Sequence, residues 1–148
     1  MNYYRQAQEM AVEVYTPDTL EHAIRLYSIF RGWEQLDEGN PAKIISAGVR
    51  VMVYAVTALL HELPLGNIDQ VRALGFSPLI VDALNALLQR PQEDYFDYIY
   101  RVMENEVARS VKLADLNDDM WGRPAPDLQW RSKYLRAEKI LRGGKKIT

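Results

Sequence analysis

Four residues that are far apart in the sequence have side chains suited to binding a divalent metal ion. The chain contains only two histidines, His22 and His61, and Glu62 follows His61 directly. Asp115 lies beside an apolar stripe with helical spacing, and an acid that borders a core usually pairs with a cation or binds a metal. Imidazole and carboxylate ligands suit manganese, iron, zinc or nickel. His22, His61, Glu62 and Asp115 are therefore a candidate metal site.

The same histidines also allow a simpler interpretation. His22 shares a helical face with Leu26 and Ile29, which indicates a buried helix, and a buried imidazole needs a hydrogen-bond partner with or without a metal. The pair His61-Glu62 is a short pattern that also occurs by chance. Residue types and spacing therefore leave two alternatives open: a metal site, or two hydrogen-bonded histidines packed in the core.

Several other kinds of site are excluded by composition. The chain contains no cysteine, which rules out disulfides, thiolate catalysis and zinc–thiolate centres. It lacks a phosphate-binding loop, a zinc-protease histidine doublet and a glycine-rich nucleotide turn. The net charge of −2 argues against a general nucleic-acid-binding protein, so we expect no nucleic-acid partner.

The candidate ligands must be positioned by helices, because no stretch shows the period-two alternation of a half-buried strand. Prolines, glycines and capping residues divide the chain into about eight predicted helices. The helix that carries His22 should follow Thr16-Pro17, with Asp18 or Thr19 as its cap, and Pro41 should open a long helix that ends at His61. Three later helices should begin at capping residues, which are Asn67, Ser77 and Asp127.

These features predict an all-α protein with one domain over residues 1–148. The segment 142–148 is basic, and we expect a flexible, solvated tail there, with a local basic patch for nucleic acid as the alternative. The longest apolar stretch, Val49–Leu60, contains Arg50 and is too short to span a bilayer. The first residues have no apolar signal core. We therefore expect a cytoplasmic protein with no membrane partner.

Several sequence stretches between about Val56 and Met120 resemble the HD superfamily of metal-dependent phosphohydrolases, and in particular its small alarmone-hydrolase branch. The resemblance implies an HD-type helical bundle. It rests on ALLHE at 58–62, LGF at 74–76, RPQEDYFDYI at 90–99 and, most specifically, VKLADLNDDM at 111–120.

Members of this family bind one divalent metal, typically manganese, through a histidine on an early helix, a His-Asp doublet and a distant Asp. The resemblance assigns these positions to His22, His61, Glu62 and Asp115, because Thr16-Pro17 and the segment from His22 are similar to the family's first histidine motif with one inserted residue. A rival alignment places Pro41–Val51 there instead. It would put Ile45 or Ser46 at the first ligand position.

This chain departs from the family pattern at positions that matter for catalysis. Glu62 replaces the Asp of the doublet and is longer by one methylene. The two acids that handle the attacking water in the family are Leu65 and Gly66 here, and neither side chain can accept a proton. Asp119 stands where the family has Asn. The family's basic loop is replaced by an acidic segment at 32–38.

Three functions are compatible with these residues. A phosphohydrolase acting on a nucleotide such as a guanosine alarmone would use Lys112 and Asp119 to bind substrate, and Asp118 or Asp119 as the replacement proton acceptor, unless Lys112 only pairs with a neighbouring acid. A degenerate relative would bind a nucleotide or a metal without turnover, as a sensor, sequestering protein or regulator. A scaffold used only for protein contacts would present aromatic side chains, for which the candidates are Tyr3, Tyr4, Trp33 and Trp121.

Overall fold

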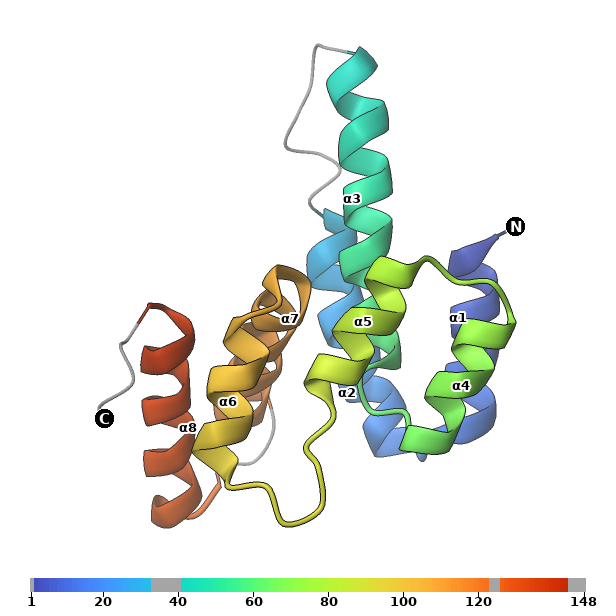
Figure 1. Ribbon diagram of the computed structural model, residues 1–148. Coiled ribbons are helices and arrows are strands. Elements are labelled where there is room, and N and C mark those ends of the chain that lie inside the picture. The colour runs from blue at the N-terminus through green and yellow to red at the C-terminus, as the bar shows by residue number, and fades with distance from the viewer. Residues whose placement is uncertain (1, 33–40, 123–125, 144–148) are drawn as a thin grey trace.

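All regular structure in the computed structural model, which describes residues 2–32, 41–122 and 126–143, is helical (Figure 1). The predicted all-α class is therefore confirmed for these residues. The helices are α1 (Tyr3–Val14), α2 (Pro17–Arg31), α3 (Pro41–Leu60), α4 (Leu65–Ala73), α5 (Pro78–Leu87), α6 (Tyr95–Met103), α7 (Glu106–Asn117) and α8 (Leu128–Leu141), with a π-helical turn η2 (Asp118–Gly122) after α7.

The helix starts follow capping chemistry, with two corrections to the sequence prediction. Thr16, rather than Asp18 or Thr19, caps α2, because Pro17 occupies the first helical position, where no N–H is needed. Asn67 does not cap α4, which already begins at Leu65. The predicted starts at Pro41, Ser77 and Asp127 agree with α3, α5 and α8.

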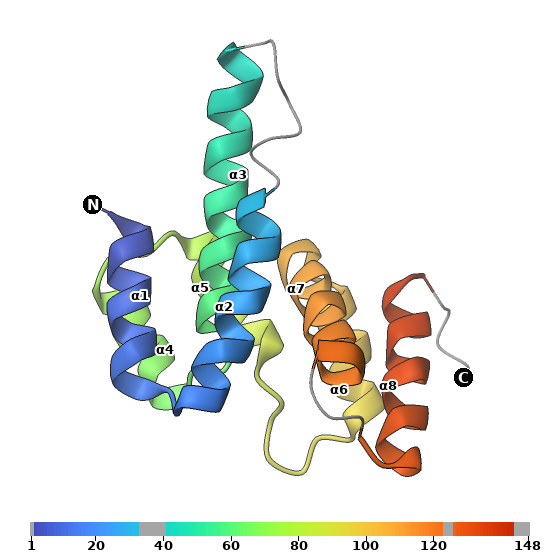
Figure 2. The same ribbon diagram turned by 180° about the vertical axis from the view of Figure 1, so that it is seen from behind.

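Helix α3 runs through the middle of the molecule. Helices α1 and α4 lie on one side of it and α6, α7 and α8 on the other, while α2 packs along its length (Figures 1 and 2). The N-terminal turns of α3 project beyond the neighbouring helices. The C-terminal turns, which lead to His61, are enclosed.

Two apolar clusters hold the C-terminal part of α3 from opposite sides. One cluster includes Ala55 and Ala58 and joins α3 to α2 and to the helices from α5 onward. The other includes Val56 and Leu59 and joins α3 to α1, α4 and α5. Full burial of a leucine side chain stabilises a fold by about 1.5 to 3 kcal/mol. The chain is therefore held firmly at the point where α3 ends and His61 begins.

The aromatic residues proposed for a protein-contact surface differ in how exposed their side chains are. Tyr3 and Tyr4 are half-buried and pack against the core, with the Tyr3 ring 5.2 Å from Phe76 and the Tyr4 ring 6.0 Å from Tyr27. Among the candidates that the structure describes, only Trp121 is widely exposed, at 74 %. Trp33 lies outside the described residues.

The acidic segment 32–38 and the basic C-terminal segment 142–148 lie mostly outside the residues that the structure describes. Arg142 is the C-cap residue that follows α8, and its side chain pairs with Glu138 at 3.0 Å. Within the described ranges, no helix has the length and apolar character needed to cross a membrane.

Candidate metal centre

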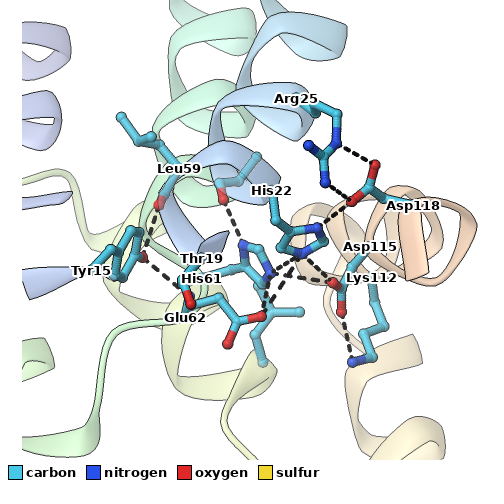
Figure 3. Close-up of polar contacts among 12 residues, drawn as sticks. Tyr15, Thr19, His22, Arg25, Leu59, His61, Glu62, Lys112, Asp115 and Asp118 are labelled. Carbon is cyan, nitrogen blue, oxygen red and sulfur yellow. Dashed lines mark hydrogen bonds and ion pairs between the residues drawn. The ribbon is translucent and has the colours of Figure 1, made fainter. Parts of the chain in front are cut away.

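The four candidate metal ligands come from three helices that meet at one end of α3. His22 lies in the middle of α2, His61 and Glu62 directly follow α3, and Asp115 lies in the last turns of α7. Figure 3 shows these side chains pointing toward one another. His22 is fully buried, and the side chains of His61 and Asp115 are 5 % and 6 % exposed. Glu62 is the outermost of the set.

The distances between the ligand atoms suit one shared ion. The Oδ1 atom of Asp115 lies 2.7 Å from Nε2 of His22 and 3.3 Å from Nε2 of His61. The Oε1 atom of Glu62 lies 3.2 Å from Nε2 of His61 and 3.8 Å from Nε2 of His22. All four atoms lie within 4.8 Å of one another. Atoms bound at about 2.0 to 2.2 Å from one ion are themselves about 3 to 3.5 Å apart, and two of the four distances above lie in that range, so the group could hold a metal ion after small side-chain shifts.

Both histidines use their Nδ1 atoms for hydrogen bonds that point away from the centre. His61 Nδ1 donates to the backbone oxygen of Ala58 at 2.6 Å, and His22 Nδ1 donates to Oδ2 of Asp118 at 2.5 Å. A metal ion that displaces the Nε2 proton would leave each imidazole donating from Nδ1 and offering its Nε2 lone pair to the ion. Metal-binding histidines are typically held by such outer hydrogen bonds.

Asp118 is itself fixed by an arginine from the same helix as His22. Nε of Arg25 donates to Oδ1 of Asp118 at 2.8 Å, and Nη2 of Arg25 donates to Oδ2 of Asp118 at 2.9 Å. Burial alone would raise the pKa of the Asp118 carboxyl, but Arg25 and His22 outweigh it and lower the pKa to about 2. Asp118 is therefore a carboxylate that lies behind His22, on the side of the ring away from Glu62 (Figure 3).

The backbone at Glu62 is held by a tyrosine from the α1–α2 connection. The Tyr15 hydroxyl donates to the backbone oxygen of Leu59 at 2.8 Å and accepts the backbone N–H of Glu62 at 3.3 Å. Burial raises the pKa of Tyr15 well above its usual range, so the hydroxyl stays protonated and can make both contacts. This bridge fixes the chain where it leaves α3.

The electrostatics of the centre favour added positive charge. Burial alone would lower the pKa of His61, but the Asp115 and Glu62 carboxylates outweigh it and raise the pKa to about 10. The hydrogen bond from His61 lowers the pKa of Glu62. Burial would raise the pKa of Asp115, yet Lys112 and the histidines hold it well below its usual range. A site that stabilises a proton between two carboxylates is also suited to a divalent cation.

A small pocket of about 250 Å³ opens beside the ligand atoms. Lys112 lines it, with a side chain only 14 % exposed and its Nζ atom 2.9 Å from Oδ2 of Asp115. The pairing of Lys112 with an acid, which the sequence left open, is therefore present. Apolar groups form much of the remaining wall, and the lining includes Leu63, Pro64, Leu87, Leu88, Gln89, Tyr95 and Tyr98.

The rival alignment of the first ligand is not compatible with this arrangement. Ile45 and Ser46 lie near the start of α3, and the rise of about 1.5 Å per residue puts them more than 20 Å along the helix from His61. His22 instead lies with its Nε2 atom 3.3 Å from that of His61. The structure therefore favours His22 as the first ligand position.

Several residues that shape the centre were not identified from sequence, or were given a different role. Asp118 was a candidate proton acceptor, but its oxygens face His22 and Arg25. Arg25 and Tyr15 were not identified, although Arg25 follows His22 by three residues and so shares its helical face. Leu65 is 58 % exposed in the first turn of α4, and Asp119 is half-buried in η2.

The chain matches no protein-family model, and no curated protein shows a significant match to it.

Proposed function

We propose that the protein is a divalent-metal-dependent phosphohydrolase of the HD type, acting on a nucleotide or another phosphorylated small molecule. The observation that carries the proposal is the convergence of His22, His61, Glu62 and Asp115, whose ligand atoms lie within 4.8 Å of one another. Their order along the chain, a first histidine, a His-acid doublet and a distant Asp, is the order that the resemblance implies. Manganese and a guanosine alarmone are the metal and substrate class that follow from the same resemblance.

The described residues supply distinct parts of this chemistry. His22, His61, Glu62 and Asp115 would hold a divalent ion, which would supply Lewis acidity toward the phosphoryl group. Lys112 contributes a buried positive charge at the wall of the pocket, where phosphate charge would be neutralised. Asp118 holds His22 rather than a substrate proton. Asp119 is therefore the remaining candidate for the proton acceptor that the family has at the positions of Leu65 and Gly66.

A second candidate function is binding without turnover. It is favoured by Leu65 and Gly66, because neither residue carries a carboxylate at the positions where the family has its two catalytic acids. Loss of a general base reduces a rate by a factor of about 100 to 10,000. With the metal site retained and the base lost, the protein would bind a phosphorylated ligand and release it unchanged.

Phosphate release from nucleoside mono-, di- and polyphosphates, measured with manganese and again with a chelator, separates the two functions. A hydrolase releases phosphate only when the metal is present, and His61→Ala abolishes that release. Under the second function, metal-dependent ligand binding occurs with no phosphate release. Metal-independent release, or release unaffected by His61→Ala, would contradict both functions.

A further inference from the structure

The hydroxyl of Tyr95 is a buried polar group that lacks a partner. Its oxygen is shielded from solvent and makes no hydrogen bond within the described part of the chain. Buried hydroxyls nearly always have a partner, so an unsatisfied one calls for a group from outside the chain, such as a water molecule or a bound ligand. Tyr95 begins α6 and lines the pocket beside the four ligands. The missing partner would therefore be a ligand of this pocket.

The surroundings of Tyr95 indicate that this partner is an anion. Lys112 lines the same pocket, and its ammonium group offers three donors, of which one contacts Asp115 and a second interacts with the Tyr98 hydroxyl. The nearby Tyr98 hydroxyl is already committed, because it donates to the backbone oxygen of Leu87 at 2.7 Å. Burial raises the pKa of Tyr95 well above its usual range, so its hydroxyl keeps its proton and acts as a donor.

The size of the pocket limits what part of a ligand can be enclosed. Pockets that bury a drug-sized ligand measure about 300 to 1,000 Å³, whereas this one measures about 250 Å³. A phosphate group fits this space, and a nucleoside attached to it would lie outside. Apolar side chains such as Leu87 and Leu88 line much of the remaining wall, and the amide nitrogen of Gln89, which also lines it, already donates to the backbone oxygen of Glu93 at 3.0 Å.

We propose that this pocket recognises a single phosphate group, which accepts a hydrogen bond from the Tyr95 hydroxyl next to the Lys112 ammonium, and that it does so without regard to the base. The inference rests on the proposed metal site and specifies which part of its ligand the pocket recognises. Tyr95 is then a binding residue that the family resemblance did not supply.

The test uses the full chain and begins with its manganese content. Inorganic phosphate is then titrated into metal-loaded protein by calorimetry. Tyr95→Phe should weaken phosphate binding roughly tenfold, the loss expected for one hydrogen bond to a charged group, and leave manganese binding unchanged. Tyr3→Phe is the matched control, because Tyr3 lies on α1 and does not line the pocket. The Tyr3 hydroxyl donates to the backbone oxygen of Gly75 at 3.3 Å. That variant should bind phosphate like the unmodified protein.

A stability measurement separates this role from a merely structural one. Removal of a buried, unsatisfied hydroxyl should stabilise the ligand-free protein, so Tyr95→Phe should raise the Tm by about 2 to 4 °C while it weakens phosphate binding. A Tyr95→Phe variant with a lower Tm or unchanged phosphate affinity would overturn the role of Tyr95.

Base recognition is tested with GMP and AMP, which should bind metal-loaded protein within about threefold of each other. A preference of tenfold or more for either nucleotide would overturn base-independent recognition. Protein that binds no manganese would overturn the proposed function and this inference together. Protein that binds manganese but no phosphate would overturn the inference alone.

Discussion

Replacement of Asp118 should weaken metal binding even though Asp118 is not one of the four ligands. Its carboxylate accepts the Nδ1–H of His22 at 2.5 Å and so directs Nε2 toward the centre. Outer partners of this kind typically contribute a factor of 10 to 100 in metal affinity. We expect Asp118→Asn, which keeps an acceptor oxygen but loses the charge, to lower the manganese affinity about 10-fold. Asp118→Ala should cost about 100-fold, or roughly 2.7 kcal/mol.

The structure also limits the loss of fold stability in these variants. The Arg25 side chain is 40 % exposed, so its charge can be hydrated once Asp118 is removed. We expect a loss of about 1 to 3 kcal/mol in the free energy of unfolding, which leaves a folded protein to assay. Gly122→Ala gives an independent route to the same defect, because a Cβ atom at Gly122 would clash with the Asp118 carboxylate.

The assay is competition for manganese against a chelating dye, with urea unfolding measured on the same samples. Asp69→Asn is the matched control, because Asp69 pairs with Arg72 at 3.1 Å on the exposed face of α4. That variant should bind manganese normally. Wild-type manganese affinity in folded Asp118→Ala would refute the orienting role of this carboxylate.

Three further changes test other parts of the structure. Tyr15→Phe removes the hydroxyl that bridges the backbones of Leu59 and Glu62. It should lower the free energy of unfolding in urea by about 1 kcal/mol and the manganese affinity several-fold. A normal manganese affinity would show that Glu62 needs no such support. The double variant Leu65→Glu, Gly66→Asp should raise metal-dependent phosphate release, because it restores carboxylates that can accept a proton. Both positions have room for the new side chains, since Leu65 is exposed and a Cβ at Gly66 meets no neighbouring atom. No gain would show that these acids alone do not restore turnover. The hydrogen bonds from the Arg101 side chain and from the backbone N–H of Arg90 lower the pKa of Glu93 to about 2. The ionised Glu93 carboxylate therefore stabilises the folded state fully above about pH 4.5, and this stabilisation is lost as the pH falls toward 2. Because solvent screens this ion pair, the stability difference between wild type and Glu93→Gln should fall by about 1 kcal/mol from pH 7 to pH 3, and a constant difference would contradict the shift.

The fold class could be predicted from sequence because it depends on local patterns, and the candidate ligands could be named because the chain has only two histidines, which fall on positions that the family resemblance marks. Apolar periodicity and capping residues indicate helices, and Pro41 and Asp127 marked helix starts correctly. Thr16 was missed as the cap of α2 because the sequence offers three adjacent short polar residues around Pro17, and only the position of the proline in the first turn decides among them.

The support of the centre could not be predicted, because it depends on contacts between distant segments. The hydrogen bond between His22 and Asp118 joins residues 96 positions apart, and it changes Asp118 from a candidate proton acceptor into a partner of a histidine. Tyr15 lies 47 residues from Glu62. The free hydroxyl of Tyr95 depends on the packing of α6 against its neighbours, and no sequence pattern encodes that.

The most direct measurement is the metal content of the protein purified without chelators, by elemental analysis per chain. We expect about one divalent ion per chain, retained on dialysis and lost in both His22→Ala and His61→Ala while the helical circular dichroism signal persists. A wild-type protein that holds no metal after incubation with manganese, iron or zinc would show that the two imidazoles and two carboxylates form only a hydrogen-bonded core.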